Sequence, residues 1–116
     1  KGIVVGTGNK VEDFGVGFYT KYGDGGVDIS PIADCNKSEV WEIGKSISVL
    51  QEIIEAAPTD GLWDDGRTDE GQLGLKYEEL EEAMSNINSI NREKYEKIRK
   101  INLHKMEPIP VCKIPN

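Results

Sequence analysis

Lysines and aspartates alternate along a short glycine-rich segment. Lys21 precedes the run YGDGG, Asp28 and Asp34 follow it, and Lys37 comes three residues after the last of these aspartates. A double turn would account for the clustered glycines. It would not account for the alternation of ammonium and carboxylate groups, which suits a ligand carrying both phosphates and hydroxyls. The segment is therefore a candidate binding site.

A second candidate is the turn GTGN at residues 6–9, which follows an apolar run. The turn is not a dinucleotide fingerprint, because Val11 stands where the third glycine of G-x-G-x-x-G would be. It still offers the Thr7 hydroxyl and backbone N–H groups to a nucleotide.

The acidic residues of the loop at 58–75 do not form an EF-hand. A calcium loop that starts at Asp65 would need an oxygen ligand and a glycine at the positions that Arg67 and Glu70 occupy. His104 is the single histidine, so a histidine-based metal site or a Cys–His pair is not expected.

Composition excludes several classes of protein. The 116 residues make one small domain or part of a larger one, and the 21 acidic and 14 basic side chains give a net charge of −7. That charge excludes nucleic-acid binding driven by overall charge. No apolar stretch has the 18 or more residues of a membrane span. Two cysteines are too few for a disulfide scaffold, so we expect a soluble, cytoplasmic protein.

The charge is unevenly distributed. Residues 55–82 carry ten acidic and two basic side chains, whereas residues 91–105 carry six basic and two acidic ones. These segments are either solvated helix faces, or a basic segment that meets phosphate and an acidic loop that handles a metal or a partner.

The elements that must position these residues can be predicted from apolar spacing. Residues 3–5 predict a buried strand of a parallel α/β sheet, residues 10–18 a short helix, and residues 27–32 a brief second strand. A buried strand so close to the first residue leads us to expect further sheet upstream.

The rest of the chain is expected to be rich in helix. Apolar residues three and four apart predict one helix over residues 40–54, capped by Asn36 or Ser38. A polar loop follows at 58–75, then helices at about 77–90 and 91–102, and an extended proline-containing tail.

The chain resembles the ammonia-transferring domain of NAD synthetases. The resemblance is carried by GTGNKVEDFGVGFYTKYGDGGVDISPIADCNKSEV, and then by APTDGLW, RTDEGQLGLKYEELE and LHK in the same order and at similar spacing. It covers residues 1–116 as the C-terminal portion of such a domain.

The resemblance implies the fold and the reaction. These enzymes have an adenine-nucleotide hydrolase-like, parallel α/β fold of the PP-loop ATP pyrophosphatase group and work as homodimers. ATP adenylates the nicotinate carboxylate of deamido-NAD and pyrophosphate leaves; ammonia, free or derived from glutamine, then displaces AMP.

The resemblance also implies ATP contacts at Thr7, Lys37 and Thr59, and a Mg²⁺ ligand at Glu12. The alternative for Glu12 is a structural one, in which the carboxylate caps the helix or pairs with Lys10.

Four further residues match deamido-NAD contacts of the family. They are Lys21, Asp28, His104 and Lys105. The last two follow the basic segment, which would explain the reversal of charge.

The sequence also departs from the family pattern. The Ser-Gly-Gly-x-Asp-Ser loop that holds the ATP pyrophosphate is not in this chain and is expected upstream of Lys1. The segment from Glu12 to Lys21 has one extra residue, and Leu50 replaces a proline, so we expect the helix to continue there. Asp60 and Asp65 also depart from the family pattern, in a loop that carries a one-residue insertion. We expect this loop to close over the substrate. The alternative function is therefore a non-catalytic nucleotide-binding or dimerisation module.

Overall fold

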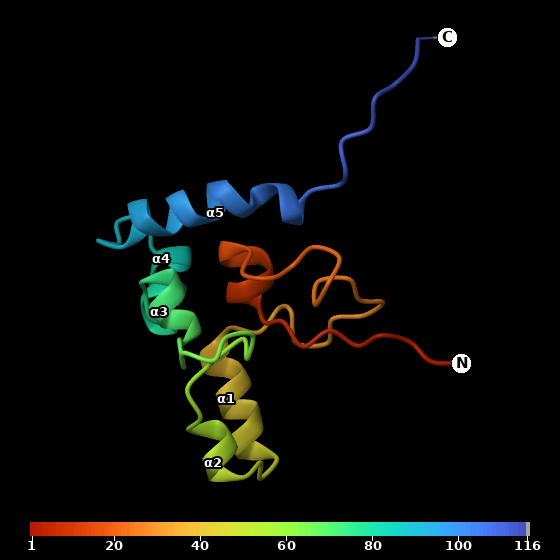
Figure 1. Cartoon of the computed structure of the whole chain (residues 1–116). Helices are drawn as coiled ribbons and strands as arrows, with labels where there is room; N and C mark the ends of the chain where they lie inside the picture. Colours follow the sequence, from red (N-terminus) through yellow and green to blue (C-terminus); the bar gives the residue numbers. More distant parts are fainter. Residues whose placement is uncertain (116) are drawn as a thin grey trace.

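The computed structural model describes residues 1–115, in which a π-helix is followed by five α-helices. Their bounds are η1 Val11–Val16, α1 Lys37–Ser46, α2 Gln51–Ile54, α3 Asp69–Leu73, α4 Tyr77–Ser85 and α5 Arg92–Met106. Helix α5 lies across η1 and α4, while α1 and α2 project away from them (Figure 1). Within the described residues, no helix is long and apolar enough to cross a membrane.

The core lies where η1, α4 and α5 meet. Val11 and Val16 of η1 and Tyr77 and Leu80 of α4 are fully buried, and Tyr95 of α5 is 6% exposed. Tyr77 and Leu80 are three residues apart and so share one face of α4, whereas Val11 and Val16 are five residues apart on the wider π-helix.

The apolar stripes of the two C-terminal helices predict Tyr77, Leu80 and Tyr95 as core residues correctly, but they also include Ile87 and Ile101, which are 76% and 74% exposed. Helix α4 ends earlier and α5 ends later than expected.

Helix η1 confirms the short helix predicted at 10–18 but has π geometry. The Gly17 N–H donates to the Glu12 carbonyl, five residues back, and Gly17 then adopts a left-handed φ of 69°. The Asn9 Oδ1 accepts from the N–H groups of Val11 and Glu12 at 3.0 and 3.2 Å and so closes the first turn. Single π turns are rare and occur most often at functional sites.

The prediction of a buried strand at 3–5 is wrong for this chain. Val5 and Ile29 form one parallel bridge, with Gly6 N–H donating to the Ile29 carbonyl at 2.7 Å. Ile3 and Val4 are 65% and 55% exposed, since within residues 1–115 nothing covers them. The parallel direction agrees with the α/β prediction, but the described residues contain no strand beyond this bridge.

The single helix predicted over 40–54 is broken. Helix α1 begins after Asn36, as predicted, and the Asn36 N–H donates to the Glu39 carboxylate at 2.6 Å. It ends before Ser48, whose φ of 60° is left-handed and cannot continue a helix. Helix α2 restarts after Leu50, so the expectation that leucine in place of proline keeps the helix continuous is also wrong.

The polar loop at 58–75 contains a short helix that the sequence analysis did not predict. Helix α3 begins after Thr68, whose Oγ1 accepts from the Gly71 N–H at 3.1 Å, and ends at Gly74 with a φ of 68°. Beyond α5, the chain continues as an exposed, extended tail (Figure 1).

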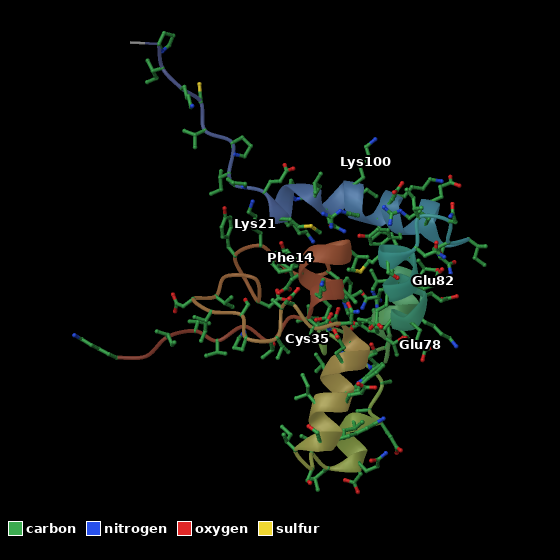
Figure 2. The ribbon with its side chains drawn as sticks, turned by 180° about the vertical axis from the view of Figure 1, so that it is seen from behind. Phe14, Lys21, Cys35, Glu78, Glu82 and Lys100 are labelled. Atoms are coloured by element: carbon green, nitrogen blue, oxygen red, sulfur yellow. The ribbon has the colours of Figure 1, made fainter. Side chains whose placement is uncertain are left out.

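The two oppositely charged segments are solvated in part. Glu78 and Glu82 lie on the outer side of α4, and Lys100 points away from the body (Figure 2). Arg99, in contrast, reaches under α5 and donates to the Gly15 carbonyl at 2.9 Å. Part of the basic segment therefore fastens α5 to η1.

Candidate functional site

A cleft of about 750 Å³ gathers residues from four separate parts of the sequence. Among the residues that line it are five of the eight predicted site residues: Thr7, Glu12, Lys37, Thr59 and Lys105. These include all three expected ATP contacts and the expected metal ligand. Segments up to 98 residues apart thus meet in one place, which sequence spacing alone could not show.

The turn that carries Thr7 is held from behind by Asn9, which is 2% exposed. Its side chain bonds to the start of η1, so the turn and the helix form one rigid piece. A Cβ at Gly8 would lie 2.1 Å from the Asp13 carboxylate, so a side chain there would push the Asp13 carboxylate aside. Thr7 is consequently fixed at the edge of the cleft.

Glu12 is held by three hydrogen-bond donors. Its Oε1 accepts from the Tyr77 hydroxyl at 2.6 Å and lies 3.5 Å from the Lys37 ammonium, and its Oε2 accepts from the Asn9 N–H at 3.1 Å. The pairing of Glu12 with Lys10 that the sequence left open is absent, since Lys10 pairs with Asp34 at 3.0 Å. The capping alternative is present as the bond from Asn9.

Lys37 is the first residue of α1 and lies beside Glu12. Its side chain is 20% exposed, and the ammonium lies 5.0 Å from the centre of the Tyr77 ring. The Glu12 carboxylate and the Tyr77 ring face both attract this ammonium and hold it at the cleft wall. It can therefore neutralise phosphate oxygens there.

Asp69 lines this cleft, and Tyr77 is bonded to two of the residues that line it. The sequence predicted neither residue as part of the site. Asp69 is 7% exposed, its Oδ2 is 3.3 Å from the Tyr77 hydroxyl, and its Oδ1 is buried without a hydrogen-bond partner. Burial raises the pKa of Asp69, the Tyr77 hydrogen bond lowers it in part, and the charge of Glu12 raises it again. The signal was weak because Asp69 stands in a polar loop and Tyr77 in an apolar helix stripe.

The pKa of Tyr77 is raised above its ordinary value, and burial is the largest cause. Its hydrogen bond to Glu12 and the charges of Glu12 and Asp69 raise this pKa again. The hydroxyl therefore keeps its proton and serves as a donor.

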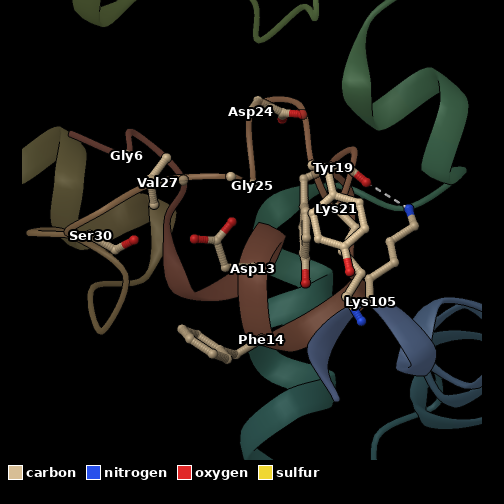
Figure 3. Close-up of a pocket in the computed structure, with 13 residues that line it drawn as sticks. Gly6, Asp13, Phe14, Tyr19, Lys21, Asp24, Gly25, Val27, Ser30 and Lys105 are labelled. Carbon is tan, nitrogen blue, oxygen red and sulfur yellow. Dashed lines mark hydrogen bonds between the residues drawn. The ribbon is translucent and has the colours of Figure 1, made fainter. Parts of the chain in front are cut away.

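A second, smaller cleft of about 340 Å³ contains Lys21 and Lys105 (Figure 3). Lys21 Nζ donates to the carbonyls of His104 and Glu107, both at 2.7 Å. Lys105 Nζ donates to the carbonyls of Gly17 and Tyr19, both at 2.8 Å. Lys105 lines both clefts, so the two expected ligand sites are neighbours.

Asp13 also faces this second cleft and was not singled out in the sequence. Its carboxylate points into the space between η1 and the glycine-rich turn (Figure 3). Burial raises its pKa, and the charges of Glu12 and Asp24 raise it further.

Two expected deamido-NAD contacts line neither of these clefts. Asp28 lies at the parallel bridge, where its carboxylate accepts from the Val4 N–H at 2.7 Å. The His104 ring is exposed, with Nδ1 3.1 Å from the Ile101 carbonyl, although its backbone carbonyl holds Lys21. The described residues therefore do not bring these two side chains together with Lys105.

Glu12 lines the larger cleft together with three other acidic residues, Asp24, Asp60 and Asp69. Residues 1–115 hold no cluster of three or more histidine, cysteine or acidic side chains arranged for a metal ion. One fixed carboxylate still fits Mg²⁺, which in nucleotide sites takes one or two carboxylates and completes its shell with phosphate oxygens and water. The residues present thus fit a metal that arrives with a nucleotide.

Comparisons with known proteins agree on one family. The family model described as NAD synthase matches residues 1–114. An NH(3)-dependent NAD(+) synthetase of Methanococcoides burtonii is 51% identical over 85 residues, or 73% of this chain and 32% of the relative. The same enzyme of Archaeoglobus fulgidus is 42% identical over 118 aligned positions, covering 97% of this chain and 47% of the relative.

A solved structure, that of NMN synthetase from Francisella tularensis, is similar at a TM-score of 0.86 and 33% identity. The match covers 97% of this chain and 47% of the solved chain. The chain thus spans about half the length of the proteins it matches, or less. Since one family model covers residues 1–114, the chain belongs to the NAD synthase family.

Proposed function

We propose that this chain is the C-terminal portion of an ATP-dependent NAD synthetase that amidates deamido-NAD, and that it supplies part of the ATP and metal site. The observation that carries the proposal is the shared cleft, in which Thr7, Glu12, Lys37 and Thr59 meet. Relatives of the chain are NH(3)-dependent NAD(+) synthetases, which supports free ammonia as the nitrogen source. The proposal includes a homodimer located in the cytoplasm.

The chemistry has two steps. A carboxylate oxygen of deamido-NAD attacks the α-phosphorus of ATP, the bond to pyrophosphate breaks, and an acyl adenylate forms. Ammonia then attacks the carbonyl carbon, loses a proton, and the bond to AMP breaks, leaving the amide. Adenylation is required because a carboxylate is a poor electrophile.

Residues of this chain would bind and orient ATP. The Lys37 ammonium neutralises phosphate charge that builds during adenylation, while Thr7 and Thr59 offer hydroxyls at the cleft edge. Glu12 would hold Mg²⁺, which when bound supplies further charge neutralisation. Lys21 and Lys105, with Asp28 and His104, would contact deamido-NAD.

The test is NAD formation by the intact protein from deamido-NAD, ATP and ammonium, followed in a coupled dehydrogenase assay. Lys37→Ala should lower kcat/KM for ATP by about 10²-fold, because a donor to developing charge is lost. Lys45→Ala removes an exposed lysine of the same helix and should leave kcat/KM unchanged. Equal values for the two variants would remove Lys37 from the site.

The substrate requires its own measurement, because the similar solved structure is an NMN synthetase. We expect deamido-NAD to be amidated faster than nicotinate mononucleotide. The opposite preference would identify the protein as a mononucleotide amidase.

The alternative is a nucleotide-binding or dimerisation module without catalysis, in which the two clefts of this chain would serve binding alone. Deamido-NAD binding by the intact protein, without release of AMP from ATP, would support that alternative.

A further inference from the structure

We propose that Tyr77 and Asp69 are positioning residues that fix the Glu12 carboxylate in the cleft for a nucleotide-bound divalent cation. The inference deepens the proposed function, on which it rests for the role of Glu12. Neither residue was expected to contribute to the site.

The Tyr77 hydroxyl approaches Glu12 from the protein interior. Tyr77 is fully buried, and its hydroxyl lies 2.6 Å from Glu12 Oε1, a short distance typical of a donor bonded to a charged oxygen. The ring is held by Trp41, whose centroid lies 6.3 Å away in an edge-on arrangement, and by Lys37 at 5.0 Å. The donor therefore has little freedom to leave its acceptor.

One hydroxyl proton stands between two carboxylates. Glu12 Oε1 is 2.6 Å from the Tyr77 oxygen and Asp69 Oδ2 is 3.3 Å from it, so Glu12 receives the stronger bond. Without the hydroxyl, the two carboxylates would face each other with no donor between them. Glu12 would then keep the Asn9 N–H and the more distant Lys37 ammonium as its donors.

Asp69 holds the hydroxyl from its far side and also connects the site to the Thr59 segment. The Asp69 N–H donates to the Pro58 carbonyl at 3.0 Å, which places residue 59 beside the same cleft. The Asp69 Oδ2 accepts from the Tyr77 hydroxyl, while the buried Oδ1 has no hydrogen-bond partner among the described residues. Asp69 therefore contributes to the site through its bond to the Tyr77 hydroxyl and through its backbone bond to Pro58.

The experiment compares Tyr77→Phe with Tyr95→Phe in the intact protein. Both tyrosines are buried in the same core, but the Tyr95 hydroxyl contacts no carboxylate within residues 1–115. The probe is Mn²⁺ in the presence of the α,β-methylene analogue of ATP, with bound Mn²⁺ measured by electron paramagnetic resonance. Tyr77→Phe should weaken Mn²⁺ binding at least about tenfold, as loss of a group that orients a metal ligand commonly does. Tyr95→Phe should leave it unchanged.

A second pair of variants covers the case in which Tyr77→Phe does not fold. Asp69→Asn keeps the size of the side chain and an oxygen beside the hydroxyl, so it should retain wild-type Mn²⁺ binding. Asp69→Ala removes both and should weaken the binding. Equal binding by the two Asp69 variants, or by the two Phe variants, overturns the inference.

Glu12→Gln separates this inference from the proposed function. If Glu12→Gln weakens Mn²⁺ binding and Tyr77→Phe does not, the positioning role fails while the metal assignment stands. If Glu12→Gln has no effect, both fail. If the wild-type protein shows the expected Mn²⁺ pattern but forms no NAD, the proposed reaction fails and the positioning role stands.

Discussion

At the scale of single residues, the site depends on buried polar groups that the cleft surface does not show. Asn9 fixes the turn of Thr7, and Tyr77 fixes Glu12. Both are less exposed than the residues they hold. Buried hydrogen bonds of this kind are strong because the surroundings have a low dielectric constant, and they are costly when left unmade.

Asp69 gives a prediction at this scale, because its folded-state pKa is raised, chiefly by burial. Folding is favoured by such a group while it is protonated, and that contribution is lost as pH rises through the raised pKa. Asp69→Asn removes the buried charge and should increase the free energy of unfolding at pH 7 by about 1 kcal/mol.

The gain from Asp69→Asn should shrink as pH falls toward the ordinary aspartate pKa of 3.8. Urea unfolding of the intact wild-type and variant proteins at pH 7, 6 and 5 measures it. A gain that is constant from pH 5 to 7 would mean that Asp69 is ionised in both the folded and the unfolded protein over this range, so that folding does not raise its pKa.

At the scale of elements, local signals predicted helix faces and one helix start, but not the breaks or the strands. The prediction that Tyr77 and Leu80 face the core is correct because their spacing is a local property of one helix, although their burial comes from packing against η1 and α5. The break at Ser48 was missed because apolar spacing alone does not reveal a left-handed residue. The strand at 3–5 was misread because its burial depends on residues far away in the sequence.

The same reasoning applies to the site. Thr7, Glu12, Lys37 and Thr59 could be named from the family pattern, and the structure places them along one cleft. Asp69 could not, since its role comes from a contact with Tyr77 across a helix boundary. The positions of Asp28 and His104 with respect to a ligand stay predictions.

The end of η1 gives a prediction at the scale of elements. Gly17 has a φ of 69°, and a Cβ there would lie 2.6 Å from the Asn102 Cβ of α5. Gly17→Ala should cost more than the roughly 1–2 kcal/mol of a left-handed alanine, because α5 must also move.

Gly61→Ala is the matched control for Gly17→Ala. Gly61 has a φ of 66° but no atom within 4 Å of its Cβ position, so only the backbone cost applies. Thermal melting of the two variants should show the larger loss for Gly17→Ala. Equal losses would contradict the close packing of α5 on η1.

At the scale of the whole molecule, the chain exposes more surface than its size requires. Its accessible surface is 8530 Å², against roughly 6300 Å² for a compact protein of this mass. Its radius of gyration is 16.1 Å, against about 13 Å for a compact domain of this length. The excess includes large apolar side chains on the α1–α2 hairpin, among them Ile47 and Ile53 at 69% and 63% exposure.

We therefore expect residues 1–116, expressed alone, to bind the dye ANS, because exposed apolar groups accept it. Replacing both Ile47 and Ile53 by lysine should lower the ANS fluorescence, while the exposed pair Lys97→Ala and Lys100→Ala should not. An unchanged fluorescence in the Ile47 and Ile53 variant would place the dye-binding surface elsewhere.

The π turn of η1 affects how many residues fit between Glu12 and Lys21. A π turn takes up one residue more than an α turn over nearly the same length of axis, so η1 fits one more residue between Glu12 and Lys21 than an α-helical turn would. Both ends of the segment keep their anchors, Glu12 on Tyr77 and Lys21 on the last turn of α5. The wider turn thus sets the number of residues between the two anchors without moving either anchored side chain out of its place.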